Sequence, residues 1–129
     1  MAPTSDDQPQ ILVMDANERN ASVLSDFLAE EGYEPEVVTD SEMAEEVVAD
    51  ASQFACALID IDRFESPVWS YCDQLEDHDV PFVVLSGLQN PTLRQESEEH
   101  GAVEFVDKPL PKQQFRDLIE TALQDNDAS

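Results

Sequence analysis

Four polar side chains that could together handle a phosphoryl group lie at or just after the ends of apolar runs. Asp15 and Asp60 follow two of these runs, Ser86 follows a third, and Lys108 comes two positions after a fourth. Taken singly, such residues have ordinary roles, because an Asp caps helices, a Ser occupies turns and a Lys is solvated. Two carboxylates, a hydroxyl and an ammonium in equivalent places indicate phosphoryl transfer onto a carboxylate.

Each of the four residues has an expected role in that chemistry. Asp60 follows the run that looks most buried and is the best candidate for the nucleophile. Ser86 would hydrogen-bond a phosphoryl oxygen, and Lys108 would neutralise its charge. Asp15 is expected to help hold Mg²⁺, which prefers oxygen ligands and usually keeps several waters.

The apolar runs are short, and three of them are nearly continuous, which is typical of strands buried on both faces of a sheet. They cover residues 11–14, 54–59, 81–85 and 102–106. Residues 36–39 form a weaker fifth run, which we expect at an edge of the sheet.

Segments with helical periodicity separate these runs. In the first helix one face is apolar, and Gly32 is a good residue to end it; the face comprises Val23, Leu24, Phe27 and Leu28. The second helix is expected to start at Asp40 or Ser41, with an apolar face of Met43, Ala44, Val47 and Val48.

The later helices are expected to begin at proline-containing caps. Ser66–Pro67 and Asn90–Pro91 each pair an N-cap residue with proline at the first helical position. The last helix should begin near Pro111. The fourth, within residues 92–100, has Leu93 as its one clear anchor, so we expect it to be loosely held.

Strand and helix thus alternate five times, which predicts a (βα)5, doubly wound α/β fold. Right-handed crossovers return the chain to the same end of a parallel sheet, with helices on both faces. Ligands bind such sheets at the carboxyl ends of the strands. Asp15, Asp60, Ser86 and Lys108 should therefore meet on one rim.

Composition excludes several classes of function. With 129 residues the chain fits one domain, and its 6 basic and 30 acidic residues give a net charge of −24. Two Lys and four Arg cannot build the basic face that nucleic-acid binding needs. The acid is spread along the chain, which favours adaptation to a salty cytoplasm, as in halophiles, over a specialised surface for a basic partner.

The same residues carry a resemblance to the CheY-like receiver domain of two-component response regulators. The matching segments are ILVMD at 11–15, ALID at 57–60, PFVVLS at 81–86 and GAVEFVDKP at 101–109. The resemblance implies a flavodoxin/CheY-like five-stranded sheet in the order 2-1-3-4-5. It also implies that Asp60 is the phospho-acceptor, with Ser86 as switch residue and Lys108 as charge partner.

The resemblance implies further roles around this site. Phe105 falls at the aromatic switch position beside the fourth and fifth helices, although a plain core or edge aromatic is the alternative. The expected partners are a histidine kinase or phosphotransfer protein and a downstream protein target. No direct nucleic-acid or membrane partner is expected, and the chain should be a monomer or weak dimer.

Departures from the receiver pattern concentrate around the expected metal. Receivers usually carry two acidic residues after the first strand, whereas Asp15 is followed by Ala16, which has no side-chain oxygen. Mg²⁺ affinity and the phosphorylation rate of Asp60 should fall accordingly. Asp62, two residues after Asp60, would compensate if its carboxylate reached the ion, at the cost of added negative charge; the expected ligands are Asp15, Asp60 and Asp62.

Three other functions use some of the same features. A receiver that no longer needs phosphate would act as an interaction module, which the loss of the second acid favours. Asp60-Ile61-Asp62 also resembles the DxD motif of haloacid-dehalogenase-type phosphatases, but too little chain follows Lys108 to supply their last acidic pair. A flavodoxin-like cofactor module is disfavoured, because the acidic turn DANERN replaces a phosphate cradle. We therefore expect that the protein is not an enzyme, and that it at most assists its own phosphorylation and dephosphorylation.

The remaining expectations concern boundaries and single residues. The domain should span 9–124, between a flexible acidic N-terminus at 1–8 and a flexible C-terminus at 125–129. No secretion signal or membrane span is evident, which favours a cytoplasmic location. Cys56 and Cys72 are expected to be buried free thiols, and His78 and His100 to be surface residues.

Overall fold

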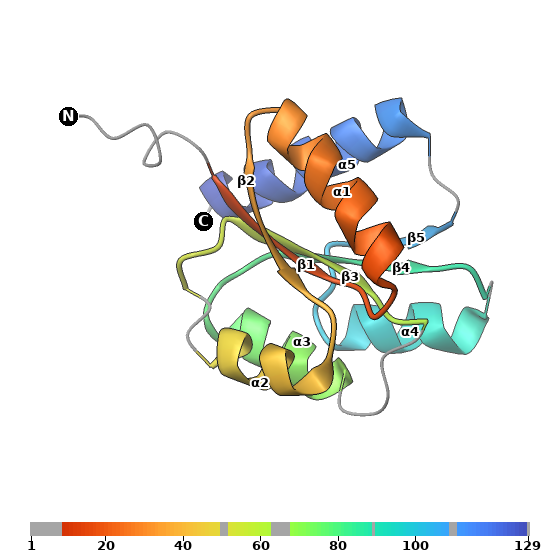
Figure 1. Ribbon diagram of the computed structural model, residues 1–129. Coiled ribbons are helices and arrows are strands. Elements are labelled where there is room, and N and C mark those ends of the chain that lie inside the picture. The colour runs from red at the N-terminus through yellow and green to blue at the C-terminus, as the bar shows by residue number, and fades with distance from the viewer. Residues whose placement is uncertain (1–8, 50–51, 63–67, 89, 109–110, 129) are drawn as a thin grey trace.

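Five parallel strands, each followed by a helix, make up the protein in a computed structural model (Figure 1). The structure describes residues 9–49, 52–62, 68–88, 90–108 and 111–128. The strands are β1 (Gln10–Met14), β2 (Glu34–Val38), β3 (Cys56–Asp60), β4 (Phe82–Ser86) and β5 (Glu104–Asp107). The helices are α1 (Glu18–Glu30), α2 (Ser41–Val48), α3 (Val68–Asp77), α4 (Pro91–Glu99) and α5 (Lys112–Ala128).

The strand order is β2-β1-β3-β4-β5, and every neighbouring pair is parallel. This confirms the (βα)5 doubly wound fold. The weakest apolar run, β2, lies at an edge as expected, and an edge tolerates Pro35, which has no N–H for a second neighbour.

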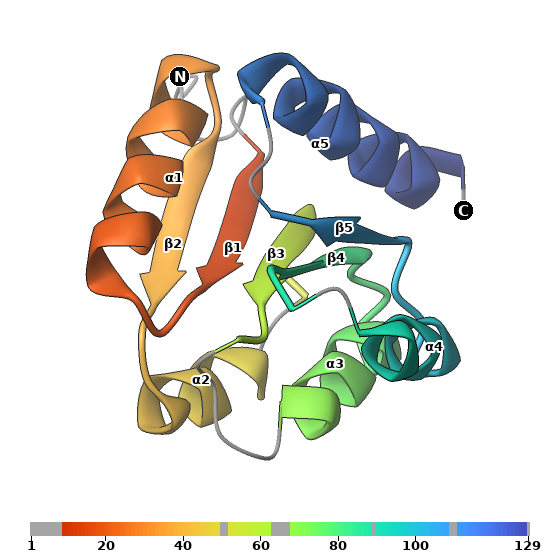
Figure 2. The same ribbon diagram turned by 90° about the vertical axis from the view of Figure 1, so that its right-hand side faces the viewer.

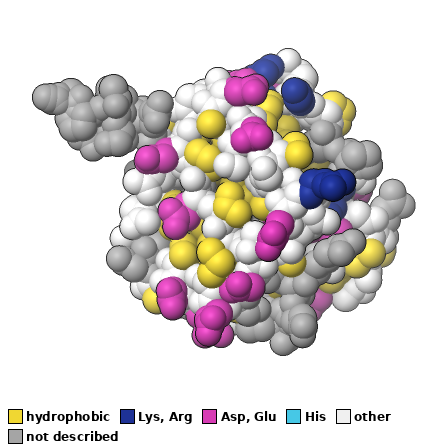
Figure 3. All heavy atoms as spheres, in the orientation of Figure 1, with side chains coloured by type: hydrophobic (Ala, Val, Ile, Leu, Met, Phe, Trp, Pro, Cys, Tyr) yellow, Lys and Arg dark blue, Asp and Glu magenta, His cyan; other side chains and the backbone are white. Residues whose placement is uncertain are grey.

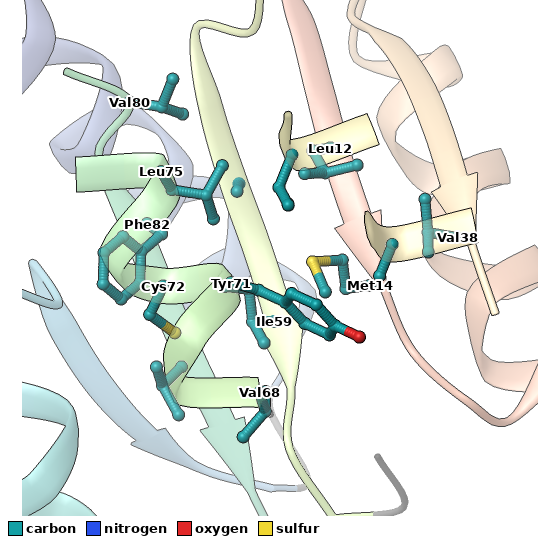
Figure 4. Packing of buried hydrophobic residues seen from close by; sticks show 14 of the residues in the cluster. Leu12, Met14, Val38, Ile59, Val68, Tyr71, Cys72, Leu75, Val80 and Phe82 are labelled. Atoms are coloured by element: carbon teal, nitrogen blue, oxygen red, sulfur yellow. The ribbon is translucent and has the colours of Figure 1, made fainter. Parts of the chain in front are cut away.

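Helices cover both faces of the sheet. In Figures 1 and 2, α1 and α5 lie on one side, and α2, α3 and α4 lie on the other. Alternate residues of each strand serve the two cores, as period-two geometry requires: Ile11 and Val13 pack on the α1–α5 side, while Leu12 and Met14 pack on the other. Figure 4 shows part of the core on the side of α2, α3 and α4, where Val68, Tyr71 and Cys72 of α3 lie beside Ile59 of β3.

Two helix starts and one helix end follow the sequence signals. The Asp40 side chain accepts a hydrogen bond from the Met43 N–H, and Asn90 accepts from the Thr92 N–H with Pro91 at the first position. Gly32 follows α1 with φ of +93°, a conformation that favours glycine. The expected cap at 66–67 lies outside the described residues.

Some expectations differ from the structure. Val23 was expected on the buried face of α1 but is 61% exposed, and Met43 of α2 is also exposed. The face predicted by periodicity is wider than the part that reaches the sheet. In addition, α5 continues to Ala128, past the boundary placed at 124; residues 124–127 are all polar, so no apolar periodicity indicated helix there.

Cys56 and Cys72 are free and buried, as expected. Burial raises the pKa of each thiol to about 12, so neither is a reactive thiolate at neutral pH. Among the described residues, no helix combines the length and apolar character needed to cross a bilayer.

Candidate functional site

Backbone hydrogen bonds beyond the strand ends fix the positions of the four rim residues. The Asp15 N–H donates to the Val38 carbonyl at 3.0 Å, and the Lys108 N–H donates to the Ser86 carbonyl at 2.9 Å. Asp60 and Ser86 are the last residues of the central strands β3 and β4. The parallel sheet thus brings Asp15, Asp60, Ser86 and Lys108 to one edge.

Lys108 joins two carboxylates of this rim. Its Nζ lies 2.6 Å from Asp60 Oδ2 and 2.8 Å from Asp62 Oδ2. Burial alone would lower the pKa of Lys108, but its hydrogen bonds to Asp60 and Asp62 prevail and raise it. A protonated ammonium thus lies directly beside the carboxylate of Asp60, which is 4% exposed.

Asp15 is the least satisfied carboxylate at the site. It is 2% exposed, and its Oδ1 accepts a hydrogen bond from the Asn17 N–H at 2.9 Å. Its Oδ2 is buried and has no hydrogen-bond partner among the described residues. Burial raises the pKa of Asp15 to about 6; the Asn17 N–H works against this shift, and the negative charge of Asp60 adds to it.

These carboxylates fit a cation bound through few protein ligands. Asp15 and Asp60 both line a hollow of about 340 Å³, and the unpartnered Asp15 Oδ2 suits a metal ion. Ala16 contributes no oxygen, and the described residues contain no group of three or more His, Cys, Asp or Glu arranged to hold a metal. Mg²⁺ usually retains several waters, so two carboxylates suffice for a weak site.

Asp62 lines the same hollow, but its carboxylate is bound to Ser86 and Lys108. Its Oδ1 accepts from Ser86 Oγ at 2.7 Å, and its Oδ2 accepts from the Gly87 N–H at 2.8 Å as well as from Lys108. Burial tends to raise the pKa of Asp62, but the bonds to Lys108, Gly87 and Ser86 lower it overall. Both carboxylate oxygens are engaged, so this arrangement does not favour the expected role of Asp62 as a metal ligand.

Phe105 does not reach the rim. It lies within β5 at 5% exposure, packed in the core on the α4 side, and the Arg94 guanidinium carbon lies 5.0 Å from its ring centroid. This burial agrees with the plain core alternative for Phe105. Its role as a switch stays a prediction.

Sequence reasoning missed a mostly apolar cavity that opens beside the rim. The cavity measures about 490 Å³ and extends from Asp15, Asp60 and Lys108 between α1 and α5. Its walls include Val23, Phe27 and Phe115, with Lys112 at the start of α5. Val23 is exposed at this wall, whereas periodicity assigned it to the core, so no signal in the sequence indicated the cavity.

Comparison with known proteins places this geometry among receivers. The family model for the response regulator receiver domain matches residues 11–120. No protein in the curated set matches the chain in sequence.

Solved structures share the fold at low identity. A CheY-like receiver domain protein from Methanospirillum hungatei JF-1 has a TM-score of 0.83 at 18% identity, covering 94% of this chain and 98% of its own. A two-component response regulator from Clostridium difficile has a TM-score of 0.81 at 19% identity, covering 91% and 97%. A Burkholderia pseudomallei response regulator, solved with a phosphorylated aspartic acid, a calcium ion and citrate, has a TM-score of 0.77 at 24% identity, covering 94% and 69%.

The family match spans most of the chain, and the solved structures share its fold. The chain therefore belongs to the response regulator receiver domain family.

Proposed function

We propose that Asp60 accepts a phosphoryl group from a histidine kinase or phosphotransfer protein in a phosphorelay. The observation that carries this proposal is the Lys108 ammonium 2.6 Å from the buried Asp60 carboxylate, on the rim that also holds the unpartnered oxygen of Asp15. Phosphoryl transfer needs an acceptor carboxylate, a cationic group beside it and oxygen ligands for Mg²⁺, and Asp60, Lys108 and Asp15 would supply these.

In the proposed step an oxygen of Asp60 attacks the phosphorus of a phosphohistidine. A P–O bond forms, the P–N bond breaks, and the imidazole nitrogen leaves with the electron pair. Lys108 remains beside the new acyl phosphate and balances its charge. Mg²⁺ held by Asp15 and Asp60 would neutralise charge on the transferring oxygens. The domain acts as an acceptor, assisting its own phosphorylation and dephosphorylation, and passes the signal to a protein bound at α4, β5 and α5.

Two solved structures of this fold support this role. The Burkholderia pseudomallei regulator carries a phosphorylated aspartic acid and a calcium ion, and the NtrC4 receiver domain was solved as a beryllofluoride-activated dimer. A phosphorylated aspartate in a protein that also holds a divalent cation thus has a precedent in this fold.

A phosphodonor assay tests the proposal. Wild type and Asp60→Asn would be incubated with acetyl phosphate and Mg²⁺ at several KCl concentrations, and the mass of the intact protein recorded. Wild type should gain one phosphoryl group, and Asp60→Asn should gain none because its amide is no nucleophile. Asp107→Asn, which alters an exposed carboxylate at the end of β5, serves as the control and should be labelled like wild type. Equal, negligible labelling of wild type and Asp60→Asn in every condition would rule out the acceptor role.

The second candidate is a receiver that binds its partner without phosphate. Ala16 in place of a second acid favours it, and so do the bonds that Asp62 makes to Ser86, Gly87 and Lys108. The same assay separates the two functions, because an interaction module requires no label on Asp60.

A further inference from the structure

Three hydrogen-bond donors at the ends of β4 and β5 form what we call the anion cradle: Ser86 Oγ, the Gly87 N–H and Lys108 Nζ. All three donate to the carboxylate of Asp62, at 2.7, 2.8 and 2.8 Å. The Leu88 N–H donates to Ser86 Oγ at 3.1 Å, so the hydroxyl accepts there and gives its own proton to Asp62. The Asp62 carboxylate therefore already accepts a hydrogen bond from each of the three groups of the anion cradle.

These donors suit a phosphoryl group as well as they suit a carboxylate. A hydroxyl, a backbone N–H and an ammonium are the groups that stabilise oxyanions in proteins. Lys108 contacts Asp60 and Asp62 together, so an anion in the cradle lies next to the proposed acceptor. A phosphoryl group on Asp60 would need the same donors that Asp62 now holds.

Gly87 packs directly beside Asp62 and Lys108. A Cβ placed on Gly87 would lie 3.5 Å from Asp62 Oδ2 and 3.7 Å from Lys108 Cε, which is ordinary van der Waals contact. The backbone of Asp62 is anchored too, because its N–H donates to Asp60 Oδ1 at 3.1 Å. The carboxylate is thus tethered two residues from the acceptor and directed into the cradle.

We propose that the Asp62 carboxylate is a built-in occupant of the anion cradle, standing where the oxygens of a phosphoryl group on Asp60 would bind. An incoming phosphoryl group must displace Asp62 before Ser86, Gly87 and Lys108 can receive it. Without phosphate, Asp62 keeps these donors drawn together. The occupancy itself follows from contacts in the structure, while the displacement step rests on the proposed function of Asp60.

Emptying the cradle should speed phosphorylation. If Asp62 fills the cradle about nine-tenths of the time, its removal raises the apparent affinity for an incoming anion about tenfold, because affinity scales with the competent fraction. Labelling of Asp60 by acetyl phosphate at subsaturating concentration should therefore be fastest in Asp62→Ala, intermediate in Asp62→Asn and slowest in wild type. A metal-ligand role for Asp62 predicts the reverse order.

Glu18→Gln is the matched control, because it removes one exposed carboxylate at the start of α1. It separates a general loss of negative charge from the loss of this carboxylate, and it should be labelled at the wild-type rate. Asp62→Asn keeps the shape of the side chain and provides a second variant if Asp62→Ala folds poorly. Labelling of Asp62→Ala and Asp62→Asn at or below the wild-type rate would overturn the displacement step.

The Gly87 amide resonance in a ¹H–¹⁵N spectrum tests occupancy without any phosphodonor. A strong hydrogen bond to a carboxylate shifts the amide proton downfield, so the Gly87 signal should move upfield in Asp62→Ala and stay in place in Glu18→Gln. An unmoved Gly87 signal in Asp62→Ala would overturn the occupancy. If the signal moves but no variant is labelled, the occupancy holds and the acceptor role of Asp60 fails.

Discussion

At the scale of single residues, Asp15 combines a functional position with an unfavourable environment. Its carboxylate is buried, one oxygen has no donor among the described residues, and the pKa rises to about 6. The folded state therefore binds the proton more tightly than the unfolded chain, in which the pKa is lower. The resulting destabilisation is fully present above pH 6 and disappears as the pH falls toward 4.

Replacing this carboxylate with an amide should stabilise the apo protein. Each pKa unit corresponds to about 1.4 kcal/mol, so the rise from 3.8 to about 6 predicts that Asp15→Asn raises the free energy of unfolding by about 3 kcal/mol at pH 8 in EDTA and high KCl. The gain should shrink toward zero near pH 4, because wild-type Asp15 is then neutral as well. Urea denaturation of both proteins at pH 8, 6 and 4.5 measures the difference.

Mg²⁺ provides the matching control for this prediction. An ion bound through Asp15 should stabilise wild type by about 1.4 kcal/mol at ten times its dissociation constant and leave Asp15→Asn unchanged. If the free energies of unfolding of wild type and Asp15→Asn differed by the same amount at every pH, the ionised Asp15 carboxylate would not be the cause of the destabilisation.

Spacing predicted which residues reach the rim, because the carboxyl ends of parallel strands must share one edge. It could not predict which neighbours each side chain contacts there. Asp62 lies two residues after Asp60 whether it turns toward the metal side or toward Ser86, and the choice depends on donors brought by β4 and β5. Residue types therefore identified the participants but left the rotamer of Asp62 open.

At the scale of elements, α4 is packed on the molecule through few apolar residues. Leu93 is half-buried, and the buried residue of this helix is Ser97, whose hydroxyl donates to the Arg94 carbonyl at 2.8 Å. The sequence predicted a loosely held helix because Leu93 is its one clear anchor. It missed a contact with α3, in which the His100 ring stacks on Trp69 with centroids 5.1 Å apart and Nδ1 lies 2.6 Å from Asp73 Oδ1.

We expect this contact to hold the C-terminal end of α4. His100→Ala removes the stacking, which is worth about 1 kcal/mol for aromatic pairs, so amide exchange in α4 should quicken by roughly fivefold. Exchange in α1 should not change. Hydrogen-exchange mass spectrometry on peptides of α4 and α1 provides the measurement.

The second histidine of the chain provides the comparison. His78 directly follows α3, and its backbone N–H donates to the Gln74 carbonyl, so His78→Ala should leave α4 exchange as it is. Equal exchange of α4 in His100→Ala and wild type would show that the His100 contact does not hold this helix. A contact between side chains of two different helices leaves no periodic pattern in the sequence. His100 was therefore predicted to be a surface residue.

At the scale of the whole molecule, the acidic surface is the dominant physical feature. Figure 3 shows carboxylates spread over one face instead of gathered in a patch. The ion pairs in the described structure use few of the 30 acidic residues; one of them, Arg116–Glu31, links α5 to α1 at 2.8 Å. With a net charge of −24, most carboxylates repel one another with little compensation.

Salt should therefore stabilise the fold. The Debye length falls from about 10 Å at 0.1 M to about 3 Å at 1 M, so repulsion between separated carboxylates is largely screened in concentrated KCl. If the relief is worth ~1 kcal/mol, the melting temperature should rise by roughly 5 °C between 0.1 M and 2 M KCl. Calorimetry or circular dichroism measures this rise.

A charge variant distinguishes screening from general salt effects. Glu45 and Glu46 are exposed in the second half of α2, where the helix dipole disfavours negative charge. The double substitution Glu45→Gln and Glu46→Gln should stabilise the protein at 0.1 M KCl, and the advantage should shrink at 2 M because salt already screens those charges. A melting temperature independent of KCl would favour the rival view, in which the acidic surface serves a basic partner. Salt would then weaken that partner's binding without changing the stability of the fold.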